Sequence, residues 1–148
     1  MFATIVVGTD GSDTARTAVR YAIDLSRELG ARLHMVSAFE PVSDPRRRSE
    51  QSQAPEDVQW QMGPHQEVLA MLEEAEGEAT AIGLTEVETH ARQGDAADAI
   101  LDVAEEQRAD LIIVGNRGMT GARRFLLGSV PNRVSHHAPC SVLIVRTT

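Results

Sequence analysis

The chain contains no lysine, and this absence excludes several kinds of chemistry. All fourteen basic residues among its 148 are arginine. A Walker-type phosphate loop needs a lysine that reaches the β- and γ-phosphates, and Schiff-base catalysis needs a lysine amine. A phospho-acceptor receiver domain, which needs a lysine near its end, is excluded for the same reason. Any phosphate site in this chain must therefore use other donors.

Cysteine and long apolar runs are also scarce. The single cysteine, Cys140, cannot form an intrachain disulfide, and we expect a packed, inert thiol in a reducing compartment. The longest apolar run, Val68 to Leu72, has five residues, whereas a bilayer span needs about 20. The N-terminus has neither the basic flank nor the cleavage site of a signal peptide. These features predict a cytoplasmic protein with no membrane partner.

Aromatic residues and positive charge are too few for a nucleic-acid-binding protein. The chain has three Phe, one Tyr and one Trp, and its net charge is −8. Bases stack on aromatic side chains, and an acidic surface repels the phosphate backbone. With 42% hydrophobic residues, the chain has the composition of one globular domain spanning residues 1–148.

Predicted strands alternate with predicted helices along the chain. Apolar, β-branched runs predict buried strands, alternation over residues 85–92 predicts a half-solvated edge strand, and apolar positions at helical spacing predict helices. This order indicates an α/β fold, a doubly wound parallel sheet in three layers. Residues 41–64, with four prolines and no periodicity, are expected to form a flexible insertion. The strands are expected at 3–7, 33–39, 85–92, 111–114 and 142–145, and the helices at 13–29, 68–82, 95–104 and 130–137.

Two glycine-containing segments follow the most apolar strands. In doubly wound sheets, ligands bind at the carboxyl ends of the strands where the strand order reverses. One segment is Thr9-Asp10-Gly11-Ser12, and the other has the spacing Gly115-x2-Gly118-x9-Gly128-Ser129. Glycine lets backbone N–H groups approach an anion, and a helix start adds unpaired N–H groups and a positive dipole end. The pattern predicts a phosphate site that needs no lysine.

The sequence resembles the universal stress protein family, in the branch that binds ATP. The resemblance covers nearly the whole chain and lies in five segments. It implies a Rossmann-like five-stranded sheet of order 3-2-1-4-5 and an ATP-binding stress-response sensor or regulator with at most slow ATP hydrolysis. The segments are Ile5–Ser12, Ser37–Pro41, Gly115–Gly118, Leu126–Val130 and His137–Val145.

The resemblance also assigns residues to an adenine-nucleotide site. Asp10 would contact the ribose, Ala38 would lie against the adenine, and the segment 128–130 would hold the β- and γ-phosphates. Asn116-Arg117 stands where the family often has a Ser-His pair, and an arginine is a better phosphate partner than histidine. Mg²⁺ or Mn²⁺ would sit on phosphate oxygens, so no side chain is expected to hold a metal ion and none to be catalytic. The assigned residues are Thr9, Asp10, Ala38, Val114, Gly115, Arg117, Gly118, Gly128, Ser129 and Val130.

Simpler roles remain open for several of these residues. Asp10 could cap the following helix, the glycines could be ordinary turn residues, and Ser129 could be an N-cap. The alternative function is a dimeric interaction module that binds partners without a nucleotide. An apolar edge strand at Val142 to Val145 predicts a homodimer through that strand. A nicotinamide dehydrogenase is excluded, because Gly8-Thr9-Asp10-Gly11 does not match G-x-G-x-x-G.

Overall fold

Five parallel strands form one sheet in the order β3-β2-β1-β4-β5. The structure is a computed structural model that describes residues 2–40, 64–116 and 127–147. The expected Rossmann-like sheet and its strand order are confirmed, with β3 and β5 at the two edges. The strands are β1 (Thr4–Gly8), β2 (Arg32–Phe39), β3 (Val87–Gln93), β4 (Leu111–Gly115) and β5 (Ser141–Val145).

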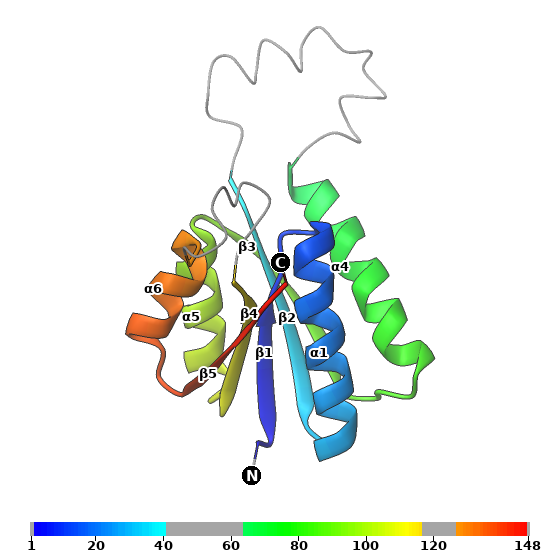
Figure 1. The fold of residues 1–148 in the computed structure, drawn as a ribbon. Coiled ribbons are helices and arrows are strands. Elements are labelled where there is room, and N and C mark those ends of the chain that lie inside the picture. The colour runs from blue at the N-terminus through cyan, green and yellow to red at the C-terminus, as the bar shows by residue number, and fades with distance from the viewer. Residues whose placement is uncertain (1, 41–63, 117–126, 148) are drawn as a thin grey trace, which may run out of the picture.

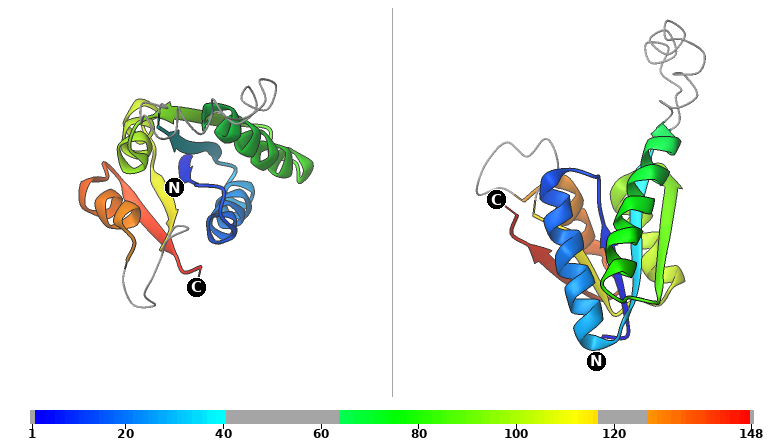
Figure 2. Two further views of the ribbon diagram at one scale, coloured as in Figure 1. Left: turned by 90° about the horizontal axis from the view of Figure 1, so that it is seen from above. Right: turned by 90° about the vertical axis from the view of Figure 1, so that its right-hand side faces the viewer.

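Helices cover both faces of the sheet and give the three expected layers (Figure 1). The helices α1 (Asp13–Leu29) and α4 (Pro64–Ala81) lie on one face. The helices α5 (Ala96–Glu106) and α6 (Ser129–His137) lie on the other (Figure 2). Because every strand is parallel to its neighbour, each connection crosses over the sheet through a helix.

The core has two halves, one on each face of the sheet. Successive side chains of a strand point to opposite faces. In β1, Ile5 and Val7 therefore pack in the cluster under α1 and α4, while Val6 packs in the cluster under α5 and α6. All three side chains are fully buried. This burial on both faces explains why β1 has no polar alternation.

The strand order reverses between β1 and β4. The chain runs outward from β1 through α1, β2 and α4 to β3, and then α5 brings it back to β4 beside β1. The two strands pair in register, with Val7 opposite Ile113. β1 and β4 therefore end at adjacent points of the same sheet edge, and the helices that come next, α1 and α6, lie on opposite faces (Figure 2). Ligands bind at this kind of position in doubly wound folds.

Helix boundaries follow the capping residues in the sequence. Ser12 is the N-cap of α1, and its hydroxyl accepts a hydrogen bond of 3.1 Å from the Ala15 N–H. Gly30, at φ 66°, is the C-cap, as expected. The prediction was wrong for Ile82, which lies beyond the end of α4 and is 40% exposed.

The insertion predicted at about 41–64 borders on α4 at its C-terminal end. Pro64 is the first residue of α4, a position where proline is favoured because its missing N–H would have no helical acceptor. The rest of that segment lies outside the described residues. Within the described ranges, no helix has both the length and the apolar character needed to cross a membrane.

Candidate functional site

The loop after β1 is held by its own side chains. The Thr9 N–H donates to the Val36 carbonyl oxygen at 3.0 Å, and the Thr9 hydroxyl accepts from the Gly11 N–H at 3.1 Å. The Asp10 carboxylate accepts from the Ser12 N–H at 2.9 Å. Asp10 therefore holds the turn before α1, whereas the N-cap role that the sequence left open for it belongs to Ser12. The Asp10 side chain is exposed at the edge where the strands end.

Two glycines in this region have structural reasons to be glycine. Gly11 has φ +80°, which a residue with a Cβ rarely adopts, and an added Cβ would lie 3.1 Å from Met71 Cγ. Gly8 lies directly under α5, where an added Cβ would overlap Ile100. Gly11 therefore allows a tight turn, and Gly8 allows close packing of α5 on the end of β1.

Asn116 joins the segments around the second glycine pattern. Its N–H donates to the Val145 carbonyl oxygen, and its own carbonyl oxygen accepts from the Gly128 N–H, both at 2.9 Å. Its side-chain oxygen accepts from the Thr147 N–H at 2.8 Å and from the Thr147 hydroxyl at 2.9 Å. These bonds therefore bring together Gly115 and Gly128, which are thirteen residues apart in the sequence. Sequence reasoning missed this role of Asn116.

The start of α6 presents main-chain donors at this edge. Gly128 is the N-cap, with φ −63° and ψ 163°, and it has no side chain with which to cap the helix. The expectation that Ser129 could be the N-cap was wrong, because Ser129 is already the first helical residue. The first intrahelical bond of this end runs from the Asn132 N–H to the Gly128 carbonyl oxygen at 3.1 Å. By helix geometry, the N–H groups of Ser129 and Val130 have no acceptor within the helix, and Pro131 has no N–H.

The other assigned residues fall on the same edge, except for two that are not described. Gly115 ends β4, and Val114 before it is buried. Ala38 is half-buried near the end of β2, on the face of α5 and α6. The structure therefore brings Thr9, Asp10, Ala38, Val114, Gly115 and the segment 128–130 to one end of the sheet. Arg117 and Gly118 lie outside the described residues.

Cys140 lies away from this edge, immediately before β5. Burial raises the pKa of its thiol, and the nearby Asp110 carboxylate raises it further. A thiol with a raised pKa holds little thiolate at neutral pH and reacts slowly. This position agrees with the packed, unreactive thiol that the sequence predicts.

Comparison with known proteins identifies the family. The profile of the universal stress protein family matches residues 1–146. The chain belongs to this family. Universal stress protein Rv1636 of Mycobacterium tuberculosis is 35% identical over 147 residues, covering 99% of this chain and 98% of its own length. A universal stress protein of Thermus aquaticus is 36% identical over 147 residues, covering 99% of this chain and all of its own.

A solved universal stress protein has the same fold. It is 36% identical to this chain, with a TM-score of 0.73 and 99% of each chain covered, and it was crystallised in complex with cAMP. The universal stress protein match spans both glycine segments, the one after β1 and the one after β4. The expected family is therefore confirmed over the whole of the candidate site.

Proposed function

We propose that this universal stress protein binds an adenine nucleotide, with ATP as its physiological ligand, where β1 and β4 end. The observation that carries the proposal is the hydrogen bond from the Gly128 N–H to the Asn116 carbonyl oxygen. This bond holds the α6 N-terminus beside the ends of β4 and β1, so that the main-chain donors of Ser129 and Val130 lie at the reversal of strand order. The cAMP held by a 36% identical relative supports an adenine ligand.

Each part of the nucleotide has a partner in this proposal. Asp10 and Thr9 contact the ribose, and the adenine lies against Ala38 with main-chain hydrogen bonds. Val114, Gly115, Arg117 and Gly118 line the ribose and the first phosphates. Gly128, Ser129 and Val130 hold the terminal phosphates. Mg²⁺ or Mn²⁺ is expected on the phosphate oxygens rather than on side chains.

The donors at α6 are sufficient for useful affinity without lysine. A hydrogen bond to a charged group contributes about 1.5–3 kcal/mol. Two N–H groups and the Ser129 hydroxyl therefore supply roughly 4.5–9 kcal/mol of gross interaction, and micromolar affinity corresponds to about 8 kcal/mol. Contacts to the adenine and ribose add to this sum.

The same residues support a regulatory role rather than rapid catalysis. Gly128, Ser129 and Val130 carry no ionisable group that could act as a general base on an attacking water. We therefore expect ATP hydrolysis to be slow and the bound nucleotide to act as a signal within a cytoplasmic stress response. Binding of ATP would stabilise the folded chain and change the surface at this edge for a partner.

The identity of the ligand is tested by mass spectrometry of small molecules released from freshly purified protein. We expect an adenine nucleotide at close to one per chain, and ATP rather than cAMP when both are supplied in equal amounts.

Gly128→Val should lose the nucleotide while keeping its circular dichroism spectrum, because Gly128 has φ −63°, which any residue can adopt. Retention of the nucleotide by this variant would contradict the site.

The alternative function, a dimeric interaction module without a nucleotide, has one observation in its favour. β5 is an edge strand of apolar residues, and Leu143 on it is 38% exposed. An apolar edge of this kind pairs readily with a second strand. We propose a homodimer through Val142 to Val145 under either function. Purified dimer that neither carries nor binds an adenine nucleotide would favour the alternative.

A further inference from the structure

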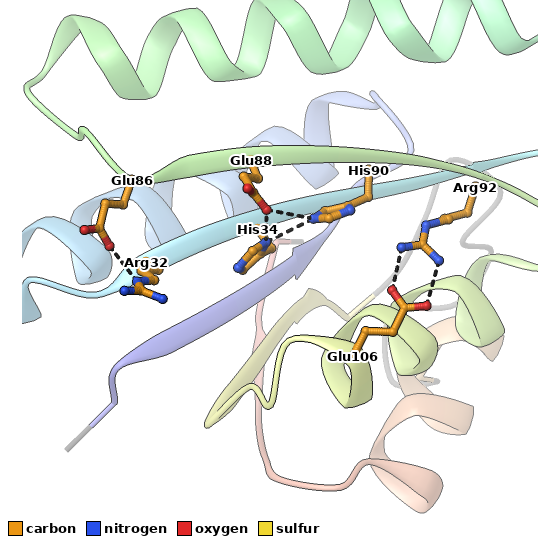
Figure 3. Close-up of polar contacts among 7 residues, drawn as sticks. All are labelled: Arg32, His34, Glu86, Glu88, His90, Arg92 and Glu106. Carbon is orange, nitrogen blue, oxygen red and sulfur yellow. Dashed lines mark hydrogen bonds and ion pairs between the residues drawn. The ribbon is translucent and has the colours of Figure 1, made fainter.

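Three side chains of types that can bind a metal ion converge on one face of β2 and β3 (Figure 3). His34 on β2 pairs in register with Glu88 on β3, and His90 lies two residues further along β3, opposite Val36. Because side chains two residues apart share a face, all three lie on the face that α5 and α6 cover. His34 and His90, 56 positions apart in the sequence, thus belong to one cluster.

The three ligand atoms form a small triangle. His34 Nδ1 lies 3.0 Å from His90 Nε2 and 3.4 Å from Glu88 Oε2, and His90 Nε2 lies 3.9 Å from the same oxygen. In a tetrahedral zinc site with bonds of about 2.0–2.1 Å, neighbouring ligand atoms lie about 3.3 Å apart. The triangle therefore has nearly the size that one tetrahedral ion requires, without rearrangement of the strands.

A hydrogen bond joins two of these atoms, His34 Nδ1 and His90 Nε2, at 3.0 Å. A neutral imidazole has one protonated nitrogen and one nitrogen with a lone pair, so one of these two nitrogens donates to the other. When a metal ion binds instead, that ring carries its proton on its other nitrogen, and both facing nitrogens and the carboxylate oxygen can coordinate the ion. The arginines on either side are engaged elsewhere. Arg32 pairs with Glu86 at 2.8 Å, and Arg92 pairs with Glu106 on α5 through two bonds of 3.0 and 2.6 Å (Figure 3). The Glu88 carboxylate faces the two histidines, with one oxygen 3.4 Å from His34 Nδ1 and 3.9 Å from His90 Nε2.

Burial prepares the histidines and leaves the carboxylate open. The His34 and His90 side chains are 7% and 14% exposed, whereas Glu88 is 66% exposed. Burial lowers the pKa of both rings. The exposed side of Glu88 gives an ion a path from solvent and leaves room for water as a fourth ligand.

We propose that this chain binds one divalent transition-metal ion, Zn²⁺, through His34 Nδ1, His90 Nε2 and the Glu88 carboxylate. Two imidazoles and one carboxylate are a common donor set for zinc, with an open position for water. The site is separate from the nucleotide site, because it lies within the sheet face rather than where the strands end. The ion fastens the edge strand β3 to β2 and thereby stabilises this side of the sheet.

Metal titration tests the proposal. The protein is untagged and nucleotide-free, and a chelator is used to remove bound metal before the titration. Co²⁺ serves as the probe, because tetrahedral Co²⁺ absorbs strongly in the visible range, and Zn²⁺ is then added to displace it. We expect one ion per chain, a tetrahedral Co²⁺ spectrum and a higher melting temperature with Zn²⁺. His90→Gln and Glu88→Gln should each weaken binding more than about tenfold, since even changes outside the ligand set cost 10–100-fold.

The matched control removes histidines elsewhere on the chain. His136 and His137 lie exposed in the last turn of α6, so the double variant H136Q/H137Q should bind Co²⁺ as the wild type does. Absence of binding by the wild type, undiminished binding by His90→Gln and Glu88→Gln, or loss of binding in H136Q/H137Q would each overturn the proposal. Glu88 is mostly exposed, so Glu88→Gln should fold even where His90→Gln does not. Both ligand variants should keep ATP binding, which separates this site from the nucleotide site.

Discussion

At the scale of single residues, we expect alanine to have opposite effects on stability at two glycine positions. Gly11→Ala forces a Cβ into a backbone at φ +80° and against Met71, so we expect a loss of about 1–2 kcal/mol in the free energy of unfolding. Gly77→Ala lies within α4 with nothing near the added Cβ, so we expect a gain of about 0.8–1 kcal/mol. Urea unfolding of both variants measures this contrast. Equal effects of the two substitutions would contradict the assigned turn.

A second residue-scale prediction concerns acid stability. The Asp110 carboxylate accepts hydrogen bonds from the Ala3 and Thr4 N–H groups at 2.7 and 3.0 Å. These bonds hold the pKa of Asp110 below its ordinary value of 3.8, so its stabilising contribution is present above that pH and is lost as pH falls through the lower, folded-state pKa. Asp110→Asn should therefore be less stable than wild type at pH 7, with a difference that shrinks below pH 3.8. A difference independent of pH would count against this role.

At the scale of elements, Asp95 connects α5 with α6. Its carboxylate caps α5 by accepting from the Asp98 N–H at 3.0 Å, and it pairs with Arg133 of α6 at 2.8 Å. Asp95→Ala loses both interactions and should destabilise the chain by about 1–2 kcal/mol. Asp95→Asn keeps a capping oxygen and loses only a surface ion pair, which is worth about 0–1 kcal/mol. Denaturant unfolding compares the two. An equal cost would show that the ion pair, not the cap, dominates.

The elements themselves were largely predictable from the sequence, because local signals define them. Ser12 and Gly30 mark the ends of α1, and the apolar run of β4 predicts a strand buried on both faces. Ile82 misled the prediction because its spacing fits a helix, whereas the chain leaves the helix at Ala81 and turns through Gly83 at φ +101°. Periodicity does not show where the last turn ends.

The candidate sites were predictable to different degrees. The glycine spacing indicates the edge where β4 and α6 meet, but the bond that closes this segment, from Gly128 to Asn116, depends on three-dimensional placement. The cluster of His34, Glu88 and His90 could not be predicted, because it depends on the register of β2 against β3. The visible signal was limited to a glutamate and a histidine two residues apart on an alternating strand. A shift of one residue would move His34 away from its partners.

At the scale of the whole molecule, the apolar edge of β5 predicts a two-fold dimer. Light scattering should give about twice the chain mass of 16.1 kDa at micromolar concentration. Leu143→Glu places a charge on the exposed edge and should shift the mass to that of one chain without loss of secondary structure. A wild-type mass near 16.1 kDa would remove the dimer from the account.

The central claim is that main-chain N–H groups at the start of α6 hold the phosphates of ATP. Ser129→Pro removes the N–H at the first helical position, where proline is tolerated, and Gly128 already has the extended conformation that precedes a proline. Ser129→Ala removes only the hydroxyl and is the matched control. Calorimetric titration with ATP should show Ser129→Pro binding at least about tenfold more weakly than Ser129→Ala, the loss of one hydrogen bond to a charged group. Equal affinity of the two variants would contradict the claim.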